Sequence, residues 1–439
     1  MLSFLLPLLL SNILQALGQT ANQIYLGHLV GVRALAAVSA IFPIIFFLIS
    51  FLIGLGSGST ALIGQAYGAR EFDKLKAVAG TTLALALGLG TLVGAAGFFL
   101  AEPILRAMGT PGDIFAISLG YAKIVFAGMP LLFVYLIYTT FLRGTGDAQT
   151  PFWALVATTV VTMAISPVLI IGLFGVPRLE TDGAAAGNLG ATFLGLIGLL
   201  VYLARSRHPL ALDRAMRANL KLQWPIVRRI VQIGVPTAIN TVMVSLAEIA
   251  VLAFVNRYGS RATAAYGAVN QVASYVQFPA VSIAIATSIF GSQAIGAGRQ
   301  ERLSKIVRSA VALNYAIEGT LILAGYLLAT GLISLFVTDA PTVEIAHRLL
   351  MITLWSYAIF GNARILSGLM IASGTVVWPT FISVFSIWGI EVPVAYVAMG
   401  AIGLAGVWFG YPASFAVGLL LQYLYYRFVW SRRRIERLI

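Results

Sequence analysis

Three carboxylates lie inside long apolar stretches of this chain. Most of the 15 acidic residues occupy polar segments or their edges, but Glu248, Glu318 and Glu391 do not. An ionised side chain at the centre of a bilayer costs about 2.5 kcal/mol or more, so such residues usually face a cavity or a partner and carry function. A buried carboxylic acid can load and release a proton, and a carboxylate beside amide oxygens can bind Na⁺. These three glutamates therefore predict an ion-coupling site.

Two further residues belong to the same predicted ion-coupling set. Arg364 is the one basic residue deep inside an apolar stretch, and we expect it to hold Glu391 or Glu318 ionised. Asn314 precedes Glu318 by four residues and so shares its helix face. At a rise of about 1.5 Å per residue, the four charged groups lie roughly 14–18 Å from the ends of their segments. The alternative is an ion pair that only locks two helices together.

Aromatic side chains supply candidates for binding an organic cation. A ring face attracts such a cation by about 0.5–2 kcal/mol. Most membrane aromatics instead pack in the core or sit at the interfaces. The candidate substrate-binding residues are Tyr25, Tyr138, Tyr266, Tyr275, Phe278, Trp355, Tyr357 and Trp388.

The composition excludes a soluble protein. The 439 residues are 59% hydrophobic and only 10% charged, with a mean hydropathy of +0.93, whereas soluble domains carry about 25% charged residues. We therefore attribute the net charge of +13 to basic residues that orient the chain in the membrane, and not to nucleic-acid binding. There is no cysteine, and the three histidines are scattered. We expect no metal site, no cofactor and no enzymatic activity.

The elements that must position these residues are membrane-spanning helices. A span needs about 20 mostly apolar residues, and the chain offers twelve. They are roughly 2–26, 34–62, 77–101, 117–142, 151–172, 184–204, 230–256, 264–292, 309–336, 345–371, 378–400 and 403–426. Most Lys and Arg residues fall on one side of these spans, which places both termini in the cytoplasm. We expect the chain in the plasma (inner) membrane.

The chain repeats itself with a shift of 228 residues. That shift pairs Gly31 with Gly259 and Pro151 with Pro379. Six spans per copy is an even number, so both copies enter the membrane in the same orientation, as in parallel-repeat transporters. An inert scaffold or a passive channel remains the alternative, because duplication alone does not establish transport. The expected domains are a six-helix lobe 1–204, a basic cytoplasmic linker 205–229 and a six-helix lobe 230–439.

Several motifs at these repeated positions resemble the multidrug and toxic compound extrusion (MATE) family. They are Gly27 with Ala36-Ala37, residues 64–69 (GQAYGA), residues 293–297 (QAIGA), and residues 142–147 (LRGTGD) followed by Thr150-Pro151. The resemblance covers nearly the whole chain. It implies an all-α, V-shaped transporter of two helix bundles, which exports amphipathic, often cationic, drugs in exchange for H⁺ or Na⁺. We expect a monomer in the lipid bilayer to be functional.

Departures from the family pattern affect the expected coupling site. Many members have an aspartate where this chain has Asn22, and the family's Asn-x-x-x-Asp-Pro appears here as Thr162 and Ser166-Pro167. A seventh-helix glutamate of some members would fall at Val244, one turn before Glu248. We therefore do not expect coupling through an aspartate of the first lobe. The glutamates of the second lobe are the expected coupling residues.

Two other functions remain open. A flippase for a lipid-linked or other amphipathic headgroup would carry an anionic cargo and favour cationic cavity residues, yet only Arg364 lies deep in a helix. A membrane enzyme would need a nucleophile with a base, or a metal set, and no histidine-based set is present.

Overall fold

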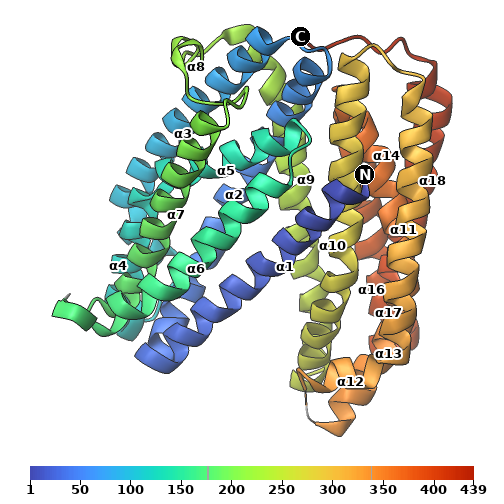
Figure 1. The fold of residues 1–439 in the computed structure, drawn as a ribbon. Coiled ribbons are helices and arrows are strands. Elements are labelled where there is room, and N and C mark those ends of the chain that lie inside the picture. The colour runs from blue at the N-terminus through green and yellow to red at the C-terminus, as the bar shows by residue number, and fades with distance from the viewer. Residues whose placement is uncertain (176, 338) are drawn as a thin grey trace. The chain divides into compact units, whose positions relative to one another are not determined.

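The chain folds into two compact helical units. The computed structural model describes residues 1–175, 177–337 and 339–439, and the described regular structure is helical (Figure 1). The units are Met1–Val231 and Gln232–Ile439. Helix α9 (Trp224–Asn256) contains the boundary between them. The expected all-α fold is confirmed.

Before α9, the described part of the N-terminal unit contains seven long α-helices or helix halves and one short α-helix. They are α1 (Leu2–Tyr25), α2 (Val32–Gly68), α3 (Phe72–Ala107), α4 (Gly112–Ala127), α5 (Met129–Gly144), α6 (Gln149–Ile171), α7 (Glu180–Arg205) and α8 (Arg214–Ala218).

In the C-terminal unit, the later helices are broken into shorter pieces. They are α10 (Ser260–Gly296), α11 (Arg302–Leu327), α12 (Ala329–Ser334), α13 (Ala340–Thr353), α14 (Tyr357–Ala372), α15 (Val377–Phe385), α16 (Val392–Ile402), α17 (Leu404–Trp408) and α18 (Gly410–Leu424). A π-helical turn, Ser386–Glu391, joins α15 to α16.

The described residues contain eleven helices long and apolar enough to cross a membrane, or twelve if one bent pair counts as a span. The bent pair is α4 and α5, which we expected as the single span 117–142, and the bend between them is 52°. Pro130 lies in the first turn of α5. Because proline has no backbone N–H, the carbonyl of Phe126 loses its helical donor and the helix breaks there.

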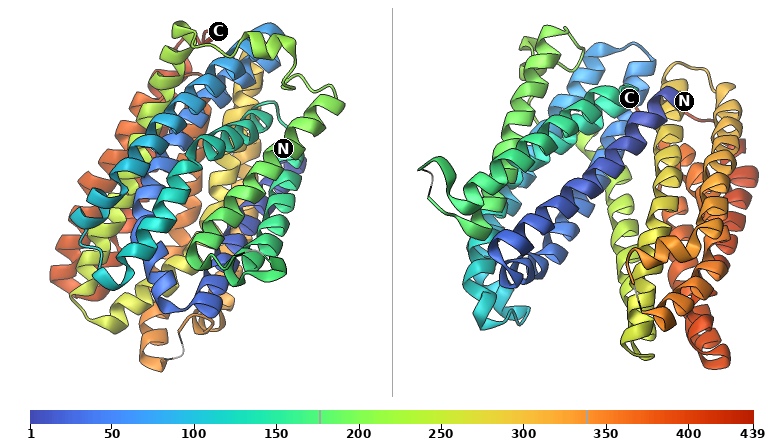
Figure 2. Two further views of the ribbon diagram at one scale, coloured as in Figure 1. Left: turned by 90° about the vertical axis from the view of Figure 1, so that its left-hand side faces the viewer. Right: turned by 60° about the horizontal axis from the view of Figure 1, so that its bottom comes forward.

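The internal repeat is visible in the helix boundaries. Helices α2 and α10 are both 37 residues long, and each begins directly after a glycine with positive φ, Gly31 at 111° and Gly259 at 88°. The same shift relates Arg70 at φ 61° to Gly298 at 71°. Within each unit most of the long helices run side by side (Figure 2).

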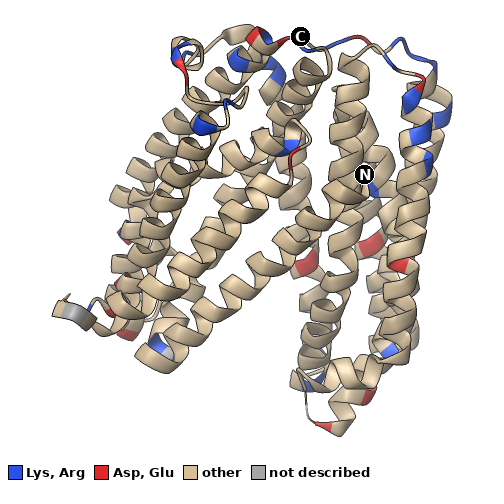
Figure 3. Ribbon diagram, viewed as in Figure 1, with Lys and Arg blue, Asp and Glu red and all other residues tan. Residues whose placement is uncertain are grey.

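The basic linker packs on the N-terminal unit. Asp213 caps α8 by accepting the Met216 N–H at 2.8 Å, and it also accepts a hydrogen bond from Lys76 of α3. The Lys76 ammonium and this backbone donor lower the pKa of Asp213. Basic residues also gather at helix ends and in the connecting loops (Figure 3).

Candidate functional site

A cavity of about 420 Å³ lies within the C-terminal unit. Helices α9, α10, α14, α15 and α18 and the π-helical turn contribute its walls. Two acids, Glu248 and Glu391, and one base, Arg364, line it. Its other polar groups are amides and hydroxyls, among them Asn240 and Asn270. The cavity thus brings together three of the four charged residues that the sequence predicted as ion-coupling.

The Glu391 side chain is positioned by a break in helical geometry. It ends the π-helical turn Ser386–Glu391, and Pro393 follows in the first turn of α16. Since proline cannot donate to the carbonyl four residues earlier, the α-helical ladder is interrupted there. Such π-helical turns are frequent at functional sites. The break was not predicted from the apolar stretch 378–400.

Glu391 is nearly buried and has one hydroxyl partner. Its side chain is 5% exposed, and Ser414 Oγ of α18 donates to Glu391 Oε2 at 2.8 Å. Helix α18 reaches this close because Gly410 has no side chain: a Cβ there would lie 2.7 Å from the Glu391 carbonyl oxygen. A second link holds the π-helical turn, in which Trp388 Nε1 donates to the Met243 carbonyl of α9 at 3.1 Å.

Glu248 is the accessible acid of the cavity. It lies on α9 and is exposed, so an ion or a cargo molecule in the cavity can reach it. Val244, one turn earlier, lines the same cavity. The two acids therefore differ in environment: the Glu391 side chain is nearly buried in the wall of the cavity, and the Glu248 side chain is exposed to the cavity interior.

Arg364 differs from the expected ion pair. In the part of the chain that the structure describes, no carboxylate lies within 4.0 Å of it. Its guanidinium carbon instead lies 5.9 Å from the ring centroid of Phe360, one turn earlier on α14. Long helical side chains lean toward the N-terminus of their helix, which brings the guanidinium over Phe360. The expected pairing with Glu391 or Glu318 is therefore wrong.

Glu318 and Asn314 do not line this cavity. Both lie on α11 and are fully buried at 0% exposure, and Asn314 Nδ2 donates to the Ala358 carbonyl of α14 at 3.1 Å. The two residues thus face α14 from outside the cavity.

Two of the eight candidate aromatics line the two cavities described in this section. Tyr357 lines the cavity of the C-terminal unit, and Tyr25 lines one of the N-terminal unit. Tyr138 is 2% exposed in the core, and Tyr266 packs against Trp408 in a buried cluster. Tyr275, Trp355 and Trp388 are exposed, and Phe278 is half-buried beside Tyr275.

Three aromatic residues of the cavity were missed from the sequence. They are Phe360, Tyr411 and Phe415. Phe360 precedes Arg364 by four residues, and this i, i+4 spacing could have placed it on the same helix face. Tyr411 and Phe415 are likewise four residues apart on α18, but nothing in the sequence indicated which face of α18 meets the cavity.

The N-terminal unit holds a neutral cavity of about 230 Å³. Asn22, Thr162 and Asn188 line it, and none of its described lining residues is charged. Asn22 and Thr162 are two positions at which the chain departs from the family's acidic pattern. Hence this cavity offers hydrogen-bonding groups but no carboxylate for ion coupling.

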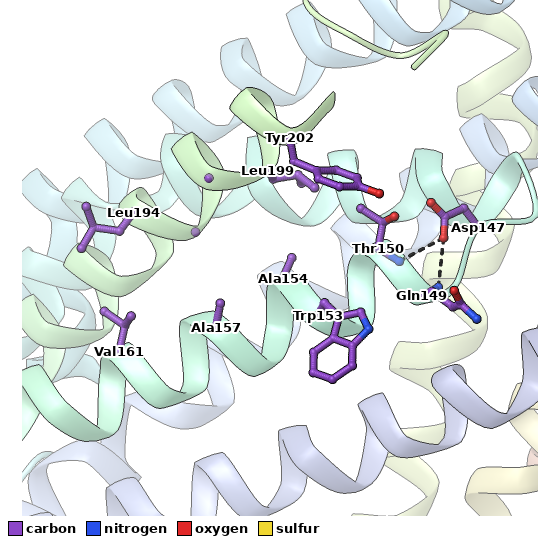
Figure 4. Close-up of a pocket in the computed structure, with 12 residues that line it drawn as sticks. Asp147, Gln149, Thr150, Trp153, Ala154, Ala157, Val161, Leu194, Leu199 and Tyr202 are labelled. Atoms are coloured by element: carbon purple, nitrogen blue, oxygen red, sulfur yellow. Dashed lines mark hydrogen bonds between the residues drawn. The ribbon is translucent and has the colours of Figure 1, made fainter. Parts of the chain in front are cut away.

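A groove of about 780 Å³ lies between α6 and α7 (Figure 4). Its middle is apolar, with Ala154, Ala157 and Leu194, and Asp147 lies at its polar end. Asp147 Oδ1 accepts the backbone N–H groups of residues 149 and 150, each at 3.0 Å. That carboxylate caps the start of α6, which is a structural role.

Comparisons with known proteins agree with the repeat and the helical fold. The MatE family model matches the chain twice, over residues 7–168 and 236–397. The probable multidrug resistance protein YoeA of Bacillus subtilis (strain 168) is 53% identical over 99% of this chain and 95% of that protein. The multidrug export protein MepA of Staphylococcus aureus (strain MSSA476) is 23% identical over 93% of this chain and 88% of that protein.

Solved structures show the same fold. A point mutant of the Vibrio cholerae MATE transporter VcmN superimposes with a TM-score of 0.90 at 20% identity, over 99% of this chain and 97% of that chain. A Pyrococcus furiosus transporter of the MOP superfamily, described as having reverse polarity of its binding pocket, gives a TM-score of 0.85 at 22% identity. The superposition covers 99% of this chain and 95% of that chain. With two matches to one family model and 53% identity to a relative along nearly its full length, this chain belongs to the MatE family of multi-pass membrane transporters.

Proposed function

We propose that this chain is a secondary antiporter that exports amphipathic organic cations in exchange for an inward-moving H⁺ or Na⁺. The observation that carries the proposal is the placement of Glu248 and Glu391 in one aromatic-lined cavity with a single base. The names of the relatives, multidrug resistance and multidrug export proteins, support a drug-like cargo.

The cavity chemistry favours a cationic cargo. Two carboxylates outnumber the one guanidinium, and Tyr357, Phe360 and Phe415 form a cluster of rings whose nearest centroids are 5.1 Å apart. Aromatic faces attract organic cations by about 0.5–2 kcal/mol each. An amphipathic cation thus meets opposite charge and an apolar surface in the same space.

Coupling follows from competition for the carboxylates. A proton or Na⁺ on Glu391 and Glu248 cancels the negative charge that holds the cargo, so loading the ion favours release of the cargo. In the reverse direction, a bound cargo cation disfavours the ion. A transporter that exposes this one cavity alternately to each side exchanges the two species. Glu391, behind the hydroxyl of Ser414, is the residue we assign to the ion, and Glu248 the residue open to the cargo.

A flippase for an anionic lipid-linked headgroup is the second candidate. It would need a cationic cavity. Arg364 is the sole base among the described residues that line the cavity of the C-terminal unit, and the described lining of the N-terminal cavity is uncharged. Both cavities therefore disfavour an anionic cargo.

Membrane orientation and assembly complete the proposal. Basic residues of the linker and of the C-terminal tail, such as Arg228 and Arg433, belong to the segments that we assign to the cytoplasm. Each of these two cavities is lined from within one unit of one chain, and this supports a functional monomer, which we place in the inner membrane.

Equilibrium binding tests the shared cavity. Tetraphenylphosphonium binding to the purified protein is expected to weaken in Glu248→Gln and to fall as H⁺ or Na⁺ rises in the wild type. Glu344→Gln is the matched control, because Glu344 is an exposed glutamate of the same unit that pairs with Arg348 at 3.5 Å. Equal binding in Glu248→Gln and wild type would refute a cationic site, and binding of an anionic lipid headgroup in its place would favour the flippase.

A further inference from the structure

Glu318 and Asn314 meet α14 at a position where that helix has no side chain. A Cβ built on Gly361 would lie 2.6 Å from Glu318 Oε2 and closer still to Asn314 Oδ1. The carboxylate oxygen and the amide oxygen thus converge on the same point above the α14 backbone. Both side chains are 0% exposed, so water does not reach them from the surface.

Within the described residues, no donor meets these converging oxygens with hydrogen-bond geometry. Neither oxygen of Glu318 nor Asn314 Oδ1 has a hydrogen-bond partner there, and a buried acceptor left unpaired destabilises the folded protein. Rotating the amide of Asn314 does not resolve this, because its Nδ2 already donates to the Ala358 carbonyl at 3.1 Å. After rotation, the amide oxygen would face that carbonyl, and two acceptors would again meet.

No described cation compensates a charge on Glu318. Helix α11 packs against α10, α12, α14 and the turn Leu354–Ser356. The titratable groups of these elements and of α11 itself are Arg261, Tyr266, Tyr275, Tyr357, Arg364, Arg302, Lys305, Arg308, Tyr315 and Tyr326.

The titratable groups on the helices that pack against α11 interact with residues other than Glu318. Arg261 pairs with Asp339 at 3.2 Å, and Tyr266 OH lies 3.3 Å from Tyr411 OH. Tyr275 OH accepts from Gln271. Tyr357 and Arg364 line the cavity. On α11, the three basic residues belong to its first turns, Tyr315 is exposed, and Tyr326 OH bonds to the backbone at residues 351 and 355.

We propose that Glu318 is a second proton-binding site, separate from the cavity, whose resident proton is donated as O–H to Asn314 Oδ1. The neutral acid removes an uncompensated charge from the protein interior, and its O–H supplies the donor that the amide oxygen lacks. A proton also needs no volume, which suits a site closed by the Gly361 backbone. The proton stays bound through the transport cycle and fastens α11 to α14.

Infrared difference spectroscopy of the reconstituted protein tests this directly. The wild type is expected to show the carbonyl band of a protonated carboxylic acid at neutral pH, and Glu318→Gln is expected to lose it. Asn314→Ala, which keeps Glu318, is expected to shift the band to higher frequency because the O–H loses its acceptor. Glu391→Gln serves as the control and keeps the band, so a failure of the cavity mechanism does not affect this readout.

Variants at Glu318 separate a resident proton from a coupling ion. Glu318→Gln carries an N–H donor in place of the O–H and is expected to retain efflux and the wild-type melting temperature at neutral pH. Raising the pH to the alkaline range is expected to lower the melting temperature of the wild type more than that of Glu318→Gln, because only Glu318 can lose a proton. Three results would each overturn the proposal: no band lost in Glu318→Gln, no shift in Asn314→Ala, or a Na⁺-specific rise in melting temperature that depends on Glu318.

Discussion

The contact between α18 and the π-helical turn can be tested by adding one methyl group. In Gly410→Ala the new Cβ would lie 2.7 Å from the carbonyl oxygen of Glu391 and 3.2 Å from the Cβ of Ala395. A backbone carbonyl cannot rotate away as a side chain can, so α18 must move. Ser414 is one turn further along the same face of α18, and its 2.8 Å hydrogen bond to Glu391 is expected to lengthen.

The expected cost comes from overpacking, which is typically about 1–3 kcal/mol. For a unit of this size, 1 kcal/mol corresponds to roughly 2–4 °C in melting temperature, so Gly410→Ala is expected to melt several degrees lower. Gly400→Ala is the matched control on α16, because nothing lies within 4 Å of its Cβ position. In Gly400→Ala only the intrinsic helix propensity of residue 400 changes, and alanine is favoured over glycine by about 1 kcal/mol.

Melting of the purified protein and efflux from proteoliposomes are measured for both variants. Gly410→Ala should lose stability and ion-coupled efflux together, while Gly400→Ala should keep efflux and melt no lower than the wild type. If the two variants melt within a degree or so of each other and transport equally, the close approach of α18 to Glu391 does not position the site.

Three further predictions concern the repeat, the linker and the cargo. Arg70 has φ 61°, and its repeat counterpart Gly298 has φ 71°. Because a non-glycine residue in the left-handed conformation costs about 1–2 kcal/mol, Arg70→Gly should raise the melting temperature. A lower melting temperature would contradict this. The pKa of Asp213 is lowered chiefly by Lys76, so its stabilising effect is present above the usual value near 3.9 and is lost as pH falls through the lower folded value. The melting difference between wild type and Asp213→Asn should therefore shrink on acidification, and a constant difference would count against it. Tyr357→Leu should weaken tetraphenylphosphonium binding by about 2- to 30-fold, as expected for one lost cation–π contact; unchanged affinity would remove Tyr357 from the cargo site.

The helical repeat could be predicted from the sequence because its signals are local. Apolar length predicts a span, and glycines such as Gly31 and Gly259 mark equivalent helix starts in both halves. The depth of each glutamate in the membrane also follows from counting along a helix. These features need no knowledge of which helices touch.

The grouping of the buried residues could not be predicted, because it depends on the rotation of each helix about its axis. Glu318 and Glu391 have similar expected depths, yet Glu391 lines the cavity and Glu318 faces Gly361 on another side of α14. The lean of Arg364 onto Phe360 and the π-helical turn before Glu391 are likewise set by tertiary packing rather than by residue spacing.

Cargo efflux from proteoliposomes under separately imposed gradients shows whether ion entry through the cavity of the C-terminal unit drives export. With wild-type protein, an inward gradient of H⁺ or of Na⁺ is expected to drive tetraphenylphosphonium out, and Glu391→Gln is expected to abolish this while remaining folded and inserted. Efflux that ignores both gradients, or a Glu391→Gln protein that couples as well as the wild type, would contradict the assignment of ion exchange to the cavity of the C-terminal unit.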